Sequence, residues 1–108
     1  MKKKPIYSVV LTTASSLKEA RQIVHGLLKK KLIACGNIVS STESHFIWKG
    51  KVCVEKETLI VLKTKEKVFE KLKDEILDLH SYEVPEIIML RIQEGFEKYL
   101  QWIDEGVE

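Results

Sequence analysis

Hydrophobic residues recur along the chain with two different periods, and these periods predict an alternation of strands and helices. Residues 6–12 form a short, β-branched apolar run of the kind found in buried strands. The apolar residues that follow recur every three or four positions, which predicts an amphipathic helix. Ser16 and Glu19 have the spacing of a capping box, so we expect this helix to begin at Ser16 and to end near Lys31.

The middle of the chain is typical of a long hairpin. Gly36 and the polar run at residues 40–42 predict a bulged or bent strand, followed by a second short segment at residues 45–48. Gly50 supplies the positive φ of a tight turn, and a return strand then extends to Thr64. Residues 59–62 have no polar face, as expected for a central strand that is covered on both sides.

A second amphipathic helix is predicted from the spacing of Phe69, Leu72, Ile76 and Leu79. Pro85 then indicates a loop before a strand at residues 87–92, and Gly95 precedes a last short helix. The order βαββαβ with a C-terminal helix predicts an α+β fold, a ferredoxin-like sandwich with an extended bent hairpin.

This topology places both crossover helices on one face of a four-stranded sheet and leaves the other face open. Large apolar residues occupy both faces of the first, third and fourth predicted strands. An apolar face of that size exceeds what soluble monomers usually expose. We therefore predict a homo-oligomer with its sheets inside, in which the hairpin pairs edge strands between subunits and Trp48 lies at the subunit contact.

Composition narrows the class of protein. The 108 residues suffice for a single domain, with residues 1–5 as a flexible tail, and no apolar run is long enough to span a membrane. A net charge of only +2 and a third strand without aromatic residues or glycine argue against nucleic acid as a partner. The N-terminal apolar run is too interrupted for a secretion signal, so we expect a cytoplasmic protein with reduced Cys35 and Cys53.

Motifs for catalysis or for an organic cofactor are not evident in the sequence. There is no glycine-rich phosphate loop and no spacing typical of a Ser/His/Asp triad. An enzyme with Cys35 as nucleophile and His80 as base would lack an identifiable orienting group. We therefore expect neither enzymatic activity nor an organic cofactor.

Several segments in order along nearly the whole chain resemble the CutA family of divalent-cation tolerance proteins. The most specific is residues 80–88, which resembles the family signature His-Pro-Tyr-Glu-Val-Pro-Glu-Ile with Ser81 in place of proline; the others are residues 32–38, 48–51, 62–64 and 99–102. The resemblance implies a cytoplasmic homotrimer, similar to the PII signalling proteins, that is associated with copper binding and copper tolerance. The ligands proposed in copper-binding relatives correspond to Thr12, Leu79 and His80, of which only His80 can ligate a metal here.

Copper would therefore need other ligands in this chain. Cys35 and Glu83 are suitable types beside His80, because Cu(I) favours thiolate and Cu(II) favours imidazole and carboxylate. Structural roles compete with these assignments: His80 can interact with the carbonyls at the end of the second helix, and Cys35 can act as a small buried hydrophobe.

A second hypothesis is a PII-like regulatory trimer that binds a small metabolite and signals to a protein partner. Its ligand would occupy a cleft between subunits lined by Lys63 and Tyr82, together with His80 and Glu83. Glu83 is also expected to accept hydrogen bonds from backbone amides or to pair with Lys63.

Overall fold

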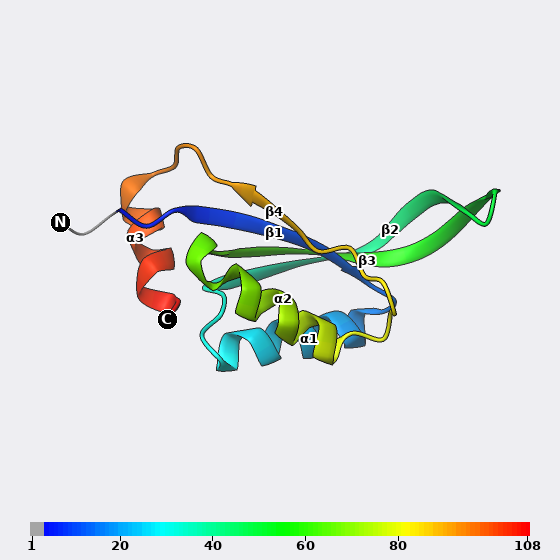
Figure 1. Cartoon of the computed structure of the whole chain (residues 1–108), viewed down its shortest axis with the longest axis horizontal. Coiled ribbons are helices and arrows are strands. Elements are labelled where there is room, and N and C mark those ends of the chain that lie inside the picture. The colour runs from blue at the N-terminus through cyan, green and yellow to red at the C-terminus, as the bar shows by residue number, and fades with distance from the viewer. Residues whose placement is uncertain (1–3) are drawn as a thin grey trace.

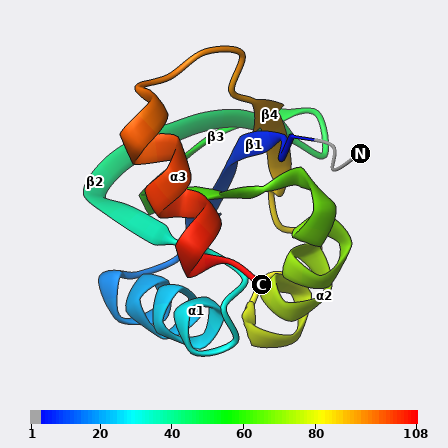
Figure 2. The ribbon, with the colours of Figure 1, turned by 90° about the vertical axis from the view of Figure 1, so that its left-hand side faces the viewer.

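A computed structural model describes residues 4–108, so most of the predicted tail at residues 1–5 lies outside the described residues. The elements are β1 (Tyr7–Ala14), α1 (Leu17–Lys29), β2 (Cys35–Trp48), β3 (Lys51–Lys65), the short 3₁₀ turn η1 (Glu66–Val68), α2 (Phe69–Leu79), β4 (Ile88–Arg91) and α3 (Glu97–Gly106). The strands form one antiparallel sheet in the order β2-β3-β1-β4. Both α1 and α2 lie on the same side of this sheet (Figures 1 and 2), which confirms the predicted ferredoxin-like sandwich.

The core lies between the sheet and the two helices. Val10 pairs with Leu62 and Thr12 pairs with Ile60, so these four side chains share the face that the helices cover. Val10, Ile60 and Leu62 are fully buried, and the helices meet them with Ile23, Leu27, Leu72 and Ile76. Burying a side chain of this kind contributes roughly 1.5–3 kcal/mol to stability, so this layer holds the two helices on the sheet.

The opposite face of the sheet is apolar and has no helix over its centre. Val9, Leu11, Leu59 and Val61 alternate with the core residues and are half-buried on this face, while Ile88 and Leu90 on β4 are 47% and 52% exposed. The expectation that residues 59–62 are covered on both sides is therefore wrong for the single chain. Ile60 and Leu62 are covered by the helices, whereas Leu59 and Val61 lie on the uncovered face.

The covered side of β1 is the more polar of its two sides. Ser8 and Thr12 point toward the helices with no exposed surface, and their hydroxyl groups have no hydrogen-bond partner within residues 4–108. Val9 and Leu11 point the other way. This distribution is the reverse of what a one-sided sheet in water requires.

The hairpin of β2 and β3 is long, bent and exposed. Its register shifts between Val39 and Thr42, where Ser41 has a φ of 62°, so the predicted bulge is confirmed and the strand continues through it as a single element. Lys49 and Gly50, with φ values of 52° and 77°, form the two-residue turn that twisted hairpins favour. The far half of the hairpin extends beyond the body (Figure 1) and exposes Phe46, Ile47, Trp48, Val52 and Val54.

Gly36 has a different role from the predicted one. It stays in register opposite Leu62 and does not form the bulge. A Cβ atom at this position would lie 2.8 Å from Cγ1 of Val24 and 3.3 Å from Cδ2 of Leu62. Glycine is needed here because α1 approaches the sheet too closely for a side chain.

The helix α3 closes one end of the sandwich, as the end-on view shows (Figure 2). Its Ile103 is fully buried in the core, and Gly106 lies against Ala34 at the start of β2. Tyr99 and Trp102 stack on each other with ring centroids 5.6 Å apart and remain partly exposed, so Ile103 and not these aromatic residues anchors the helix.

Replacing Gly36 with alanine should destabilise the fold by about 1–3 kcal/mol, because the added methyl group forces Val24 and α1 away from the sheet. Urea unfolding measures the change. The matched control is Gly50→Asn, which keeps a residue that tolerates positive φ at a position with open space around it and should change stability by less than about 0.5 kcal/mol. Equal stability of Gly36→Ala and the parent protein would contradict the close approach.

Candidate functional site at the corner between α2 and the bent hairpin

His80 ends α2 and lies entirely inside the protein. Its backbone N–H donates to the carbonyl of Ile76 at 2.9 Å, and its side chain has no exposed surface. The ring atom Nε2 lies 2.6 Å from the carbonyl oxygen of Thr13, and Nδ1 lies 3.0 Å from the backbone nitrogen of Tyr82. Because a carbonyl only accepts and a backbone N–H only donates, Nε2 must carry the proton and Nδ1 must present its lone pair.

This arrangement uses both ring nitrogens of His80. A metal ion needs a free nitrogen lone pair, and the only one on the neutral ring accepts the hydrogen bond from Tyr82. The ring therefore fixes the α2–β4 loop to the end of β1, and ligation of an ion by His80 requires one of its two hydrogen bonds to break.

Glu19 joins the first turn of α1 to the same loop. Ser16 accepts a hydrogen bond from the Glu19 N–H at 3.1 Å, which confirms half of the predicted capping box. The Glu19 carboxylate does not return this bond: it accepts from the N–H and the hydroxyl of Ser15, both at 2.9 Å, and from the N–H of Ser81 at 2.8 Å. Burial alone would raise the pKa of Glu19, but the hydrogen bonds from Ser81 and Ser15 outweigh it and lower the pKa to about 2.

Tyr82 joins the loop to the hairpin. Its hydroxyl donates to Oε2 of Glu57 at 2.7 Å, and its ring lies 4.7 Å from the ring of His80. Burial and the neighbouring Glu57 carboxylate both raise the pKa of the Tyr82 phenol. Glu57 also lines an open hollow of about 360 Å³ beside the bulge, together with Ser15, Leu17, Ser40, Ser41, Lys56 and Thr58.

The other predicted site residues lie elsewhere. Lys63 pairs with both Cys35 and Val9 and so belongs to the uncovered face of the sheet. Its ammonium group donates to Oδ1 of Asn37, and the Cys35 thiol lies 3.8 Å from the same oxygen. Lys63 is six residues from Glu57 along β3, which corresponds to roughly 20 Å.

Glu83 is exposed in the α2–β4 loop, so the expected pairing of Glu83 with Lys63 does not form within residues 4–108. Trp48 is 61% exposed at the hairpin tip, far from both groups. One chain therefore holds two separate clusters, one around His80 and Tyr82 and one around Cys35 and Lys63.

A metal site is not formed by one chain. The described part of the chain contains no group of three or more His, Cys, Asp or Glu side chains that could hold a metal ion. His80, Cys35 and Glu83 are not brought together, and His80 has no free lone pair. A copper site of the predicted composition does not fit the isolated chain.

Three partners of the site were not identified from the sequence. Glu19 was recognised only as a capping residue, and its bond to Ser81 depends on how α1 packs beside the loop. The Thr13 carbonyl is a backbone group that no sequence motif marks. The sequence contains only a weak indication that Glu57 belongs to the site, namely that it is an acidic residue just before an apolar strand segment.

The fold and this corner define a class: a ferredoxin-like domain whose loop after the second helix is fixed by a buried histidine. The family model described as "CutA1 divalent ion tolerance protein" matches residues 8–106. The chain belongs to this family.

Relatives agree along the full length. The divalent-cation tolerance protein CutA of Archaeoglobus fulgidus is 40% identical over 103 residues, covering 95% of this chain and 100% of that protein. The protein of the same name from Thermus thermophilus is 43% identical over 98 residues, covering 91% and 95%. The resemblance inferred from the sequence is thereby confirmed. The family is named for tolerance and not for an enzymatic reaction.

Solved structures show the same fold. The Thermus thermophilus Cut A1 structure has a TM-score of 0.92 at 41% identity and covers 94% of this chain and 99% of that one. CutA1 from Oryza sativa has a TM-score of 0.93 at 34% identity and covers 95% and 94%. Within residues 4–108, no helix has the length and apolar character needed to cross a membrane.

The Glu19 carboxylate should make stability depend on acid pH. Because its pKa in the folded protein is about 2, below the ordinary value of 4.5, its stabilising effect is complete above pH 4.5 and is lost as the pH falls toward 2. Glu19→Gln should lower stability by about 1–3 kcal/mol at pH 7 and flatten the loss between pH 4.5 and 2. Denaturant unfolding across this pH range measures both effects, with the exposed Glu94→Gln as control. An unchanged acid profile in Glu19→Gln would show that the carboxylate does not hold the corner together.

Proposed function

We propose that this protein acts as a cytoplasmic homotrimer that binds divalent cations, copper foremost, without catalysing a reaction. The observation that carries the proposal is the uncovered apolar face of the sheet. Whatever the protein binds then lies along the seams where sister subunits cover that face. The family supports the divalent ion.

Assembly follows from two different apolar surfaces. One is the uncovered sheet face with Val9, Leu11, Val61 and Leu90, and the other is the projecting half of the hairpin with Trp48. A hairpin that docks on the next subunit makes a heterologous contact, and such contacts form closed rings when the rotation between subunits allows it. A three-membered ring is also the arrangement that the resemblance to PII proteins implies.

Placing a charge on the uncovered face should break the trimer. Leu90→Lys adds a lysine where the neighbouring subunit is expected, so sedimentation velocity should show mainly monomer. Leu77→Lys, on α2 and 45% exposed compared with 52% for Leu90, should leave the assembly intact. A trimer that survives Leu90→Lys unchanged would place the subunit contact elsewhere.

The ion is proposed to be held by Cys35 and Glu83 from different subunits. Cys35 is half-buried on the uncovered face and Glu83 is exposed in a loop, and the proposal places both side chains at the contact between subunits. A thiolate suits Cu(I), and a carboxylate suits Cu(II). His80 is left out of this set because both of its ring nitrogens are engaged.

Calorimetric titration with Cu²⁺ tests this ligand set. Cys35→Ser and Glu83→Gln should each weaken binding about tenfold or more, while the matched control Cys53→Ser should bind like the parent. His80→Gln, in a sample confirmed to be trimeric, should also keep its affinity. Loss of binding in His80→Gln with retention in Cys35→Ser would reverse the assignment.

The regulatory alternative has one observation in its favour. Lys63 and Asn37 form a polar pair on an otherwise apolar face, which is where a cleft between subunits would need a charged group. Tyr82 bonds to Glu57, which lies six residues and roughly 20 Å along β3 from Lys63, so the proposed cleft takes Lys63 and Tyr82 from different subunits. Stabilisation of the protein by nucleotides and not by Cu²⁺ in a thermal-shift screen would favour this function.

A further inference from the structure

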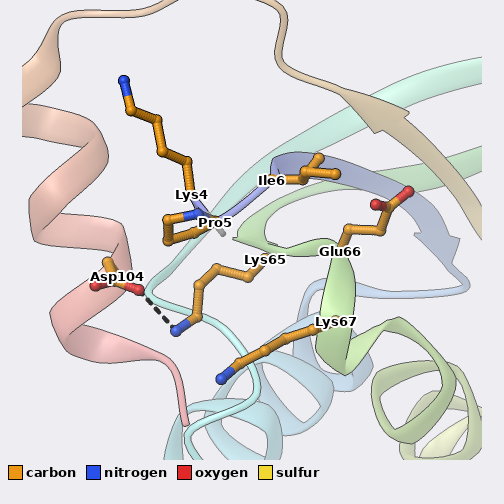
Figure 3. A pocket seen from close by; sticks show the side chains of 7 residues that line it. All are labelled: Lys4, Pro5, Ile6, Lys65, Glu66, Lys67 and Asp104. Atoms are coloured by element: carbon orange, nitrogen blue, oxygen red, sulfur yellow. Dashed lines mark hydrogen bonds and ion pairs between the residues drawn. The ribbon is translucent and has the colours of Figure 1, made fainter. Parts of the chain in front are cut away.

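A separate hollow lies at the end of the molecule away from the hairpin. It has a volume of about 320 Å³ and is open to solvent where the start of β1, the end of β3, η1 and α3 meet (Figure 3). None of the residues discussed above as ion ligands or cleft residues belongs to it. Its lining consists of Lys4, Pro5, Ile6, Lys65, Glu66, Lys67 and Asp104.

The charges around the hollow leave an excess of positive charge. Asp104 accepts a hydrogen bond from Lys65 at 2.8 Å, and Glu66 is paired with Arg91 at 2.8 Å, so both acidic groups already have a basic partner. Lys67 and Lys4 form no ion pair with any other residue in the range 4–108. The hydrogen bond from Lys65, together with the charges of Lys65 and Lys67, lowers the pKa of Asp104.

Lys65 is held rigidly at the wall of the hollow. Its side chain is only 7% exposed, and it extends toward α3 alongside Lys67 (Figure 3). The ammonium group has three N–H donors, and within the described chain only the bond to Asp104 uses one of them. A buried ammonium with free donors next to an unpaired lysine favours a negatively charged group.

The remaining wall is apolar. Pro5 and Ile6 lie beside the lysines, and Ile6 is 43% exposed. This surface would gain from contact with a compact hydrocarbon group.

We propose that this hollow binds a small organic anion, whose carboxylate or phosphate group contacts Lys65 and Lys67 while its apolar part packs on Pro5 and Ile6. The site uses none of the residues of the proposed ion site or of the proposed cleft, although Lys63 lies only two residues before Lys65 on β3.

Backbone amide NMR with butyrate, phenyl phosphate and neutral butyramide tests the proposal. Butyrate or phenyl phosphate should shift the amide signals of Ile6, Lys65, Lys67 and Asp104 in a saturable way, and butyramide should not. Lys67→Gln should weaken binding at least fivefold. The exposed Lys18→Gln on α1 is the matched control and should bind like the parent.

Three outcomes would overturn the site. The first is that neither anion shifts these signals, and the second is that butyramide shifts them as strongly as butyrate. The third is that binding is lost in Lys63→Gln and kept in Lys67→Gln. The last result would assign the anion to the cleft of the regulatory alternative. Inorganic phosphate that binds as tightly as phenyl phosphate would overturn the apolar half of the proposal.

Discussion

The uncovered face of the sheet is the constraint on which the other features depend. Val9, Leu11 and Val61 cannot be buried by the two helices, because the alternation of an antiparallel strand sends them to the opposite side from Val10 and Leu62. Exchanging them for polar residues would satisfy a monomer, yet the chain instead places Ser8 and Thr12 on the covered side. The sequence is therefore suited to a sheet that is buried twice, once by its own helices and once by other copies.

The hydrogen bonds around His80 hold the hairpin, α1 and the α2–β4 loop in fixed positions relative to one another. The hairpin, α1 and the loop before β4 are distant in sequence and are joined there through Tyr82 with Glu57 and through Glu19 with Ser81. Because His80 contributes both ring nitrogens to this network, the most recognisable residue of the loop has a structural role in the isolated chain.

Much of the fold could be predicted because it depends on local sequence. Ser16 begins α1 through its own side chain, Gly50 permits the turn, and Pro85 lies in the loop before β4, each acting on neighbours in the chain. The role of Gly36 was mistaken, because only the approach of Val24 from α1 reveals it. The site was predicted less well for the same reason: strand register separates Lys63 from Tyr82, and no sequence pattern reports that distance. The hollow near α3 was not predicted because Lys4 is about sixty residues away in sequence from Lys65 and Lys67.

Static light scattering of the wild-type protein over a dilution series tests the central claim most directly. The account predicts a particle of about three times the 12.5 kDa mass of one chain that persists on dilution, because separation would expose the apolar face to water. A stable, soluble particle of 12.5 kDa across the series would show that water tolerates this face, and would contradict the account.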